Sequence, residues 1–388
     1  MILRAGILYD GTLDSPRRNV DIVIDGEKIS QIRNAVEGGL VDGSAACITP
    51  GMVNAHVHLI ASGEPNTMNA IALMNQNQQM LAAVTNAVKS LRAGVTTVRD
   101  LGSTLGIAQA LRDAIELGSV PGPRMRAAGR ALCMTGGHGW FVGRQVDGPW
   151  DARKAVREEL FAGADCIKVI ATGGVLTKGA VPANAQLLPE ELEAAISEAH
   201  RHGLRVASHA IGTEGIKNAL RAGIDSVEHG HMLDDEAIEL FKERDVYLVP
   251  TLAAPACILE HVNEGEQPPW VIEKAERINE ALQRNISRAY EAGVKIAGGS
   301  DAGTPYNHHD NYAYEVELMH RLLGMTPQKA LHAATAVAAE LIGLHKGTLA
   351  PGEPADLILL DRDVAEDIRT LRRPRRVIKA GKTVARDQ

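Results

Sequence analysis

The chain has 388 residues, of which 45% are hydrophobic and 23% are charged. This composition is typical of a globular protein with a large core, and it excludes an intrinsically disordered chain. The formal net charge of −7 and the aromatic content of 3% argue against nucleic acid and anionic membrane as partners. A small-molecule substrate is therefore the expected partner.

The cysteines Cys47, Cys133, Cys166 and Cys257 form no CxxC pair. Asp10 interrupts the N-terminal segment before the apolar region of a secretory signal can form. No apolar run approaches the roughly 18 residues that a membrane helix needs. These features predict reduced thiols in a cytoplasmic protein.

Both ends of the chain predict β-structure. Residues 1–49 contain the runs ILRAGILYD and DIVIDGEKISQI, with a turn at Asp25-Gly26 that favours a hairpin. Residues 347–388 contain the runs ADLILLD and RRVIKAGKTV. We expect strands from both termini to meet in one small β-sandwich.

Between these ends, one pattern recurs: a helical stretch ends in a glycine, and a run rich in Val, Ile and Ala follows. Glycine just past a helix adopts the left-handed conformation that ends it, and the run that follows is the next strand. The glycines are Gly94, Gly163, Gly203, Gly223 and Gly293. Strands are predicted over 51–58, 95–100, 125–133, 166–172, 205–210, 226–230, 247–252 and 295–301. Helices are predicted over 76–92, 104–117, 151–162, 189–202, 213–222, 234–243 and 271–292.

Eight βα units in about 250 residues fit an α/β fold of the (β/α)8 TIM-type barrel class, here over residues 50–346. A doubly wound open sheet is the alternative, but no G-x-G-x-x-G motif opens the first unit. We expect mobile loops over 59–75, 174–188 and 260–270.

The first predicted barrel strand ends in His56-Val-His58. Alternate residues of a strand share a face, so the two imidazoles point the same way and could bind one metal ion. For this motif alone, a pair of ordinary histidines at a strand end is an equally open alternative.

Four further polar residues lie toward the C-terminal ends of predicted strands. Lys168 lies in the apolar run DCIKVIA, where a lysine is unfavourable unless it is exposed or chemically used. His209 ends the fifth strand, His229 the sixth and Asp301 the eighth. In a barrel, these ends form the face on which active sites are built. Singly, the histidines could be core residues and Asp301 a helix N-cap, but six such residues in this order favour a functional site.

Together, these segments resemble the amidohydrolase superfamily, in its subgroup with two metal ions. The resemblance covers nearly the whole chain and rests on TPGMVNAHVH, DCIKVIATGG, VEHG, GGSDAGTP and LAPGEPADLILLD. The segments GGHG and KVIATGG are similar to the prolidase-like, imidazolonepropionase-related branch, which includes Xaa-Pro dipeptidases and carboxypeptidases.

The resemblance implies a role for each candidate residue. The HxH pair would bind the first metal, and the two single histidines would bind the second. Lys168, carboxylated by CO₂, would bridge both metals. Asp301 would bind the first metal and shuttle a proton, which makes it the expected catalytic residue. The implied metal ligands are His56, His58, Lys168, His209, His229 and Asp301.

The expected cofactors are two divalent metal ions and the CO₂-derived carbamate on Lys168. Imidazole and carboxylate ligands suit Zn²⁺, with Mn²⁺, Co²⁺ and Fe²⁺ as alternatives. Because a metal ion lowers the pKa of bound water to about 7, a hydroxide that bridges the ions would attack a carbonyl that one of them polarises. An uncarboxylated Lys168 would instead leave a mononuclear site.

Two further histidines are candidates for substrate binding. His138 lies in the glycine loop TGGHG, where the family's histidine contacts substrate; a histidine that only orders its loop is the alternative. His231 follows His229 by two residues, where several relatives have a tyrosine that polarises the scissile carbonyl, and it could donate that hydrogen bond instead. His308 and His309 are expected at the pocket rim or as solvated loop residues.

The sequence therefore predicts an enzyme that hydrolyses an amide-type C–N bond in a dipeptide or an N-acyl amino acid. The same metal chemistry could serve a cyclic amide, a carbamate or urea, an ester or a phosphotriester. A non-catalytic barrel used as a structural module is a third alternative, but such descendants lose ligands and every ligand position is filled here. Relatives are often homo-oligomers, so a homo-oligomer is an open alternative to a monomer.

Overall fold

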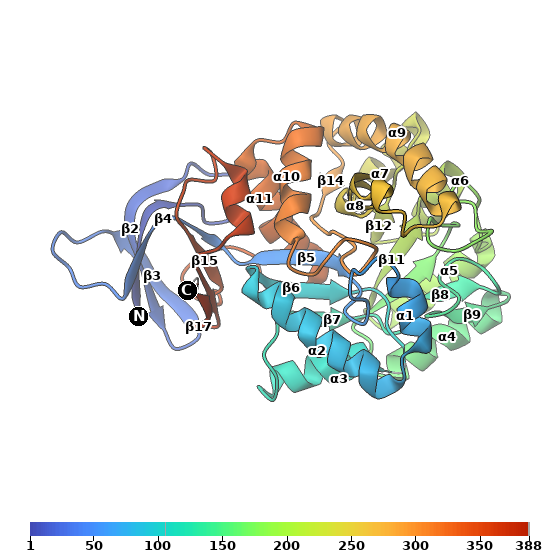
Figure 1. The fold of residues 1–388 in the computed structure, drawn as a ribbon, viewed down its shortest axis with the longest axis horizontal. Coiled ribbons are helices and arrows are strands. Elements are labelled where there is room, and N and C mark those ends of the chain that lie inside the picture. Colours follow the sequence, from blue (N-terminus) through green and yellow to red (C-terminus); the bar gives the residue numbers. More distant parts are fainter. Residues whose placement is uncertain (105, 387–388) are drawn as a thin grey trace.

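A computed structural model describes residues 1–104 and 106–386. A small β-structure built from strands of both ends of the chain lies beside a larger barrel of strands and helices (Figure 1). The α/β class and the combination of a TIM-type barrel with a β-sandwich are confirmed.

The sandwich strands are hydrogen-bonded in the order β17-β16-β15-β4-β1-β2-β3. β1 and β4 are parallel, and the other neighbours are antiparallel. The predicted turn at Asp25-Gly26 joins β2 to β3. The strands are β1 Ile2–Leu8, β2 Arg17–Asp25, β3 Lys28–Asn34, β4 Gly43–Pro50, β15 Leu357–Leu360, β16 Arg376–Lys379 and β17 Lys382–Arg386.

The barrel strands are parallel, in the orders β5-β6-β7 and β14-β13-β12-β11-β10-β8-β9. The barrel closes where β5 meets the segment after β14: Asp301 N donates to His56 O at 2.9 Å, and Ala55 N donates to Gly298 O at 3.0 Å. This closure brings the ends of the first and last strands together. The strands are β5 Met52–Val57, β6 Val95–Asp100, β7 Arg124–Ala127, β8 Leu132–Met134, β9 Arg144–Val146, β10 Cys166–Ile170, β11 Arg205–Ala210, β12 Ser226–His229, β13 Tyr247–Val249 and β14 Lys295–Ile296.

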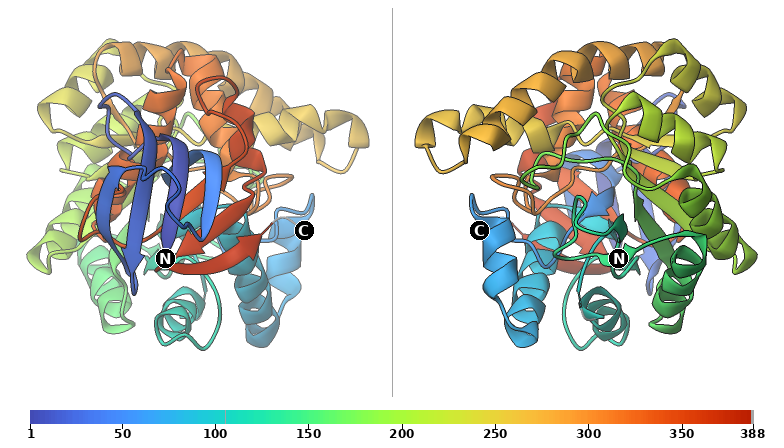
Figure 2. Two further views of the ribbon diagram at one scale, coloured as in Figure 1. Left: turned by 90° about the vertical axis from the view of Figure 1, so that its left-hand side faces the viewer. Right: turned by 90° about the vertical axis from the view of Figure 1, so that its right-hand side faces the viewer.

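Helices lie around the outside of these strands (Figure 2). The start of α2 shows why the sequence folds this way locally, because the Asn75 side chain accepts from Gln78 N while Gln78 Oε1 accepts from Asn75 N. The helices are α1 Thr67–Leu73, α2 Gln76–Arg92, α3 Ile107–Glu116, α4 Pro149–Phe161, α5 Pro189–Arg201, α6 Thr213–Arg221, α7 Asp235–Glu243, α8 Ala253–Glu260, α9 Pro269–Glu291, α10 Tyr312–Leu323, α11 Pro327–His332 and α12 Ala338–Ile342.

The recurring glycines have the left-handed backbone that the pattern predicts. Their φ angles are 90° at Gly94, 85° at Gly163, 71° at Gly203, and 91° at both Gly223 and Gly293. Each lies one or two residues beyond a helix and shortly before the next strand. The glycine therefore ends the helix and turns the chain back into the barrel.

Three predicted strands differ from the structure. The strand expected over 247–252 is regular only as β13, and Thr251 has a φ of 48°. The strand expected over 125–133 is interrupted at 128–131, where Gly129 has a φ of 74° and Arg130 turns to contact Glu159 of α4 at 2.7 Å. The strand expected over 295–301 is regular only as β14, since its later residues bend to close the barrel on β5. The segment 59–75, expected as a loop, contains α1.

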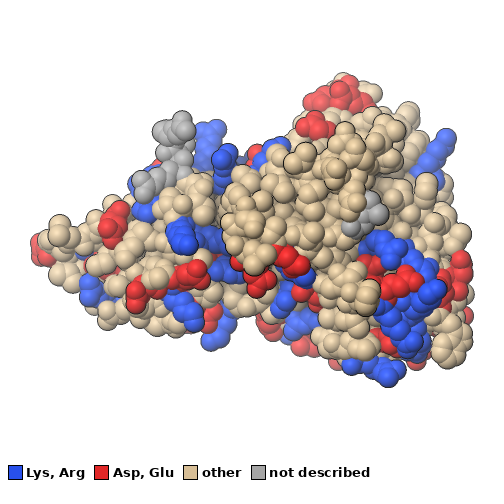
Figure 3. Space-filling model, turned by 90° about the horizontal axis from the view of Figure 1, so that it is seen from below, with Lys and Arg blue, Asp and Glu red and all other residues tan. Residues whose placement is uncertain are grey.

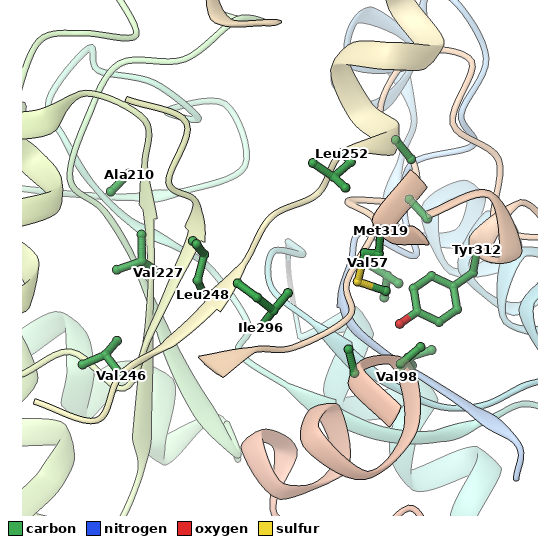
Figure 4. Close-up of a cluster of buried hydrophobic side chains, with 14 of the residues drawn as sticks. Val57, Val98, Ala210, Val227, Val246, Leu248, Leu252, Ile296, Tyr312 and Met319 are labelled. Atoms are coloured by element: carbon green, nitrogen blue, oxygen red, sulfur yellow. The ribbon is translucent and has the colours of Figure 1, made fainter. Parts of the chain in front are cut away.

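The barrel core is aliphatic, as the low aromatic content predicts. Val57, Val227 and Leu248 of the strands belong to one buried cluster with Tyr312 and Met319 of α10 (Figure 4). β15 joins this core to that of the sandwich, because its alternate residues belong to the two clusters. Acidic and basic side chains are interspersed on the face in Figure 3. Within the described residues, no helix is long and apolar enough to cross a membrane.

Replacing Gly94 with alanine should destabilise the protein more than replacing Gly293. Both alanines would carry left-handed strain of about 1–2 kcal/mol. A Cβ at Gly94 would lie 2.8 Å from Cδ1 of Ile358 in β15, whereas nothing lies within 4 Å of a Cβ at Gly293. Overpacking should lower the free energy of unfolding of Gly94→Ala by about 1 kcal/mol more. Denaturant unfolding measures the difference, and equal losses would contradict close packing of Gly94 against β15.

Candidate metal centre

The candidate ligands come together at the C-terminal ends of the barrel strands. They are contributed by β5 and the residue after it, by β10, β11 and β12, and by the segment after β14. All of them line one cavity, which also contains both candidate substrate-binding histidines. The six are His56, His58, Lys168, His209, His229 and Asp301.

His56, His58 and Asp301 form the tightest group. Oδ1 of Asp301 lies 3.3 Å from Nε2 of His56 and 3.2 Å from Nε2 of His58. One ligand atom from each residue lies within 4.8 Å of the others, which is close enough for all three to hold one metal ion. Two imidazole nitrogens and a carboxylate oxygen are a donor set that suits Zn²⁺.

The outer nitrogens of this pair contact protein acceptors. Oε2 of Glu228 lies 3.0 Å from Nδ1 of His56, and Gly102 O lies 3.2 Å from Nδ1 of His58. Because a carbonyl or an ionised carboxylate can only accept, these contacts favour the proton on Nδ1 of each ring. Nε2 of each ring faces Oδ1 of Asp301, where a bound metal ion would take the place of a proton.

His209 and His229 are oriented in the same way, and their ring centroids are 4.6 Å apart. Nε2 of His209 donates to Gly173 O at 3.0 Å, so its lone pair lies on Nδ1. The Thr251 hydroxyl donates to Pro250 O at 2.8 Å and accepts from Nδ1 of His229 at 2.7 Å. The lone pair of His229 therefore lies on Nε2. Thus each of the four histidines keeps one nitrogen available for a ligand.

Burial keeps the rings of His56, His209 and His229 neutral. It lowers the pKa of His209 and of His229 well below the usual range, and it lowers the pKa of His56 to about 4. Burial alone would lower the pKa of His58 as well, but its contact with Asp301 raises that pKa. Burial alone would raise the pKa of Asp301, but the contacts with His56 and His58 lower it. Neutral imidazoles beside an ionised carboxylate are the protonation states that a metal ion needs.

Lys168 lies inside β10 and is only 2% exposed. Its Nζ has no hydrogen-bond partner within the described chain. Burial lowers the pKa of the amine to about 8, against the opposing effect of Glu228 and Asp301. A buried amine without a partner is unfavourable in a core, so its place among the histidines points to a chemical use.

Backbone strain is concentrated at this end of the barrel. His229, Thr251 and Asp301 have φ angles of 75°, 48° and 57°, in the left-handed region that favours glycine. Each follows or ends a barrel strand and contributes to the site or orients a residue in it. Such strain persists where surrounding contacts fix the backbone, and it is typical of functional sites.

The sequence interpretation missed an ion pair in the barrel interior below the histidines. Arg99 of β6 is 2% exposed, and its Nη2 donates to Oε1 of Glu228 of β12 at 2.9 Å. Nε of Arg99 also donates to Ala55 O at 2.8 Å, and the Ser226 hydroxyl donates to Oε1 of Glu228 at 2.6 Å. Burial alone would raise the pKa of Glu228, but Arg99 and His56 lower it to about 2. The available signal was a charged residue inside each of the apolar runs TTVRD and SVEHG.

The two remaining loop histidines do not line the cavity. His309 is 1% exposed and its Nε2 contacts Ala61 O at 2.8 Å, while Nδ1 of His308 contacts Ser62 O at 3.2 Å. The expectation of a pocket rim or a solvated loop is therefore wrong for His309. Both residues instead fasten the loop after Asp301 to the loop after β5.

The barrel and its imidazole–carboxylate centre define a class of metal-dependent hydrolases. The chain belongs to the amidohydrolase family, whose sequence model matches residues 47–384. Ochratoxinase from Aspergillus niger is 30% identical over 416 residues, which cover 97% of this chain and 84% of that protein.

Solved structures agree with this assignment. A Xaa-Pro dipeptidase with methionine bound in its active site has a TM-score of 0.89 and 34% identity, and the match covers 98% of both chains. A prolidase complexed with N-methylphosphonate-L-proline has a TM-score of 0.90 and 30% identity, with 100% of this chain and 99% of that chain covered. The predicted resemblance is confirmed, and the chain is a metal-dependent hydrolase of C–N bonds.

The variant Arg99→Met should leave Glu228 buried without its cation and lower the free energy of unfolding by about 3–5 kcal/mol. The double variant Arg99→Met/Glu228→Gln should be more stable than this single variant, because it leaves no unpaired carboxylate at position 228. Denaturant unfolding of the metal-free proteins tests the order. If the double variant were no more stable, the ion pair would not be the reason for the loss.

Proposed function

We propose that the chain hydrolyses an amide-type C–N bond in dipeptides or N-acyl amino acids, at a centre for two divalent metal ions. The observation that carries the proposal is the orientation of the four histidines. Each ring directs one nitrogen to a protein acceptor and leaves the other for a metal ion, beside Lys168 and Asp301 in one cavity. The relatives named Xaa-Pro dipeptidase and prolidase support a peptide-like substrate.

In this proposal, one ion is held by His56, His58 and Asp301, and the other by His209 and His229. Zn²⁺ is favoured by the neutral imidazoles, with Mn²⁺, Co²⁺ or Fe²⁺ as alternatives. When bound, the ions would supply hydroxide at neutral pH by lowering the pKa of a shared water to about 7, and they would polarise the scissile carbonyl. The protein's own groups then position the substrate and move the proton.

Lys168 is proposed to carry a carbamate formed from CO₂. Its lowered pKa of about 8 increases the fraction of neutral amine, which is the form that attacks CO₂. Attack of the neutral amine on CO₂, with loss of one proton, leaves an anion whose two oxygen atoms would serve as ligands for the metal ions. The buried Nζ without a hydrogen-bond partner supports this assignment over a structural lysine.

Asp301 is the proposed catalytic residue. Its ionised carboxylate accepts the proton of the attacking water and donates it to the leaving nitrogen. The backbone of Asp301 is fixed on both sides, because its N–H donates to His56 O at 2.9 Å and Asn307 Nδ2 donates to its carbonyl at 3.1 Å. Neither contact uses the carboxylate, which stays available for proton transfer.

His138 and His231 are the proposed substrate-binding residues. Nδ1 of His138 contacts Thr177 Oγ1 at 2.8 Å, which leaves Nε2 for a ligand. Nε2 of His231 donates to Pro250 O at 3.1 Å, and its Nδ1 is buried and has no hydrogen-bond partner among the described residues. In a neutral ring that nitrogen accepts, so we propose that His231 receives a substrate N–H rather than donating to the carbonyl.

Asp301→Asn should lower kcat by about 10²–10⁴-fold while the protein stays folded, because the amide cannot take up the proton. Turnover of a dipeptide or N-acyl amino acid library, together with circular dichroism, measures both effects. Asp310→Asn, an exposed aspartate in the same loop, is the matched control and should keep the activity. Wild-type kcat in Asp301→Asn would remove Asp301 from the mechanism.

Lys168→Ala should lose at least one of the two metal ions, measured by elemental analysis of the purified protein. Acetate should restore part of the metal content, because a small carboxylate can take the place of the carbamate. Lys379→Ala, at a partly buried lysine that donates to Gly122 O outside the cavity, is the control and should keep its metal. Full metal loading of Lys168→Ala would contradict a bridging carbamate, and a metal-free wild-type protein would favour the non-catalytic alternative.

A further inference from the structure

The cavity over the metal centre has a sharp division of chemistry. Its floor consists of the candidate ligands, whereas its walls are aliphatic and aromatic. Its volume is about 130 Å³, measured as the space open to the centre of a water-sized sphere, and the cavity opens to solvent. The walls that matter most for a bound molecule are Met68 of α1, Phe141, Leu176, Ile211, Ile258 of α8 and Ile278 of α9.

Charged groups are confined to the floor. Of the described residues that line the cavity, and apart from its histidines, only Lys168 and Asp301 can carry a charge. Both are assigned to the metal centre. The described lining therefore contains no arginine for a substrate carboxylate and no second carboxylate for a substrate ammonium.

Lys274 of α9, one turn before Ile278, does not add a free cation for the substrate. Nζ of Lys274 donates to the carbonyl oxygens of Gly174, Thr177 and Ala180, so its N–H groups are already used. These bonds tie α9 to the loop that carries Leu176. Lys274 thus holds the apolar wall in place instead of offering a charge to the substrate.

We propose that the substrate is an amide with apolar and uncharged groups on both sides of the scissile bond, such as an N-acyl amino acid amide, an end-blocked dipeptide or an N-aryl amide. The inference rests on the proposed function and narrows it to molecules whose ends are blocked. Apolar groups gain from leaving water in such a cavity, whereas a free carboxylate or ammonium would be desolvated there without a partner.

Three compounds that share the phenylalanine side chain test this directly: N-hexanoyl-phenylalaninamide, N-hexanoyl-phenylalanine and the zwitterionic dipeptide Leu-Phe. With metal-loaded wild-type protein, kcat/KM for the neutral amide should exceed that for the free acid at least about 30-fold, with the dipeptide cleaved more slowly still. Most of the difference should lie in KM, because the charge affects binding. A free acid or dipeptide cleaved as well as the neutral compound would overturn the inference and leave the hydrolase proposal standing.

A binding measurement separates the two proposals. Ketomethylene analogues of the three compounds, in which CH₂ replaces the scissile N–H, cannot be cleaved and are titrated by calorimetry. Tighter binding of the neutral analogue without turnover of any amide would support the substrate class and overturn the hydrolase proposal. Equal binding of neutral and charged analogues would overturn the substrate class whatever the turnover.

Leu176 offers a matched pair of variants, because it is only partly buried. Leu176→Arg places a cation on the wall, and Leu176→Gln changes polarity without adding charge. Relative to Leu176→Gln, the arginine variant should shift the ratio of kcat/KM for free acid over neutral amide at least about tenfold toward the acid. If this ratio were the same in both variants, the lack of a cation on the wall would not be the reason that the protein prefers the neutral amide.

Discussion

Burial of charge inside the barrel is the constraint on which the site depends. Arg99 and Glu228 pair across the interior from β6 to β12, fully removed from water, and Glu228 reaches on to Nδ1 of His56. Removing either partner would leave an unpaired buried ion. The pair therefore holds β6 and β12 together and fixes the imidazole ring of His56, which Glu228 contacts. The same contact orients the His56 ring so that its inner nitrogen faces Asp301. Support of the barrel and preparation of the metal centre are thus one network.

Much of the fold could be predicted because its signals are local. The helix–glycine–strand pattern located β6 and β11 at their observed bounds, since a left-handed glycine and a β-branched run act over a few residues. The break in the third strand could not be predicted, because it depends on Arg130 reaching Glu159 of α4. The loop predicted over 59–75 hid α1, a short helix without a side-chain cap.

The candidate site was predictable for a different reason. Parallel barrel strands bring their C-terminal ends to one face, so polar residues at those ends converge whatever their separation along the chain. That rule located His209, His229 and Asp301, and the period of two within a strand located the histidine pair of β5. The rule did not predict the Arg99–Glu228 ion pair. Contacts across a barrel between non-neighbouring strands produce no recognisable spacing in the sequence. The direction of the His231 hydrogen bond likewise depends on Pro250, a residue of another segment.

The cavity thus has a polar floor of candidate metal ligands, which the buried Arg99–Glu228 pair orders from below. Its apolar walls exclude water from the reacting bond. Anomalous X-ray diffraction from crystals of the purified protein tests the two-metal centre most directly. The data are recorded on both sides of the zinc absorption edge and of the edges of the other candidate metals. The account predicts two anomalous peaks in the cavity, one beside His56, His58 and Asp301 and one beside His209 and His229, with density extending the Lys168 side chain between them. A single peak with an unmodified Lys168, or no peak in the cavity, would contradict it.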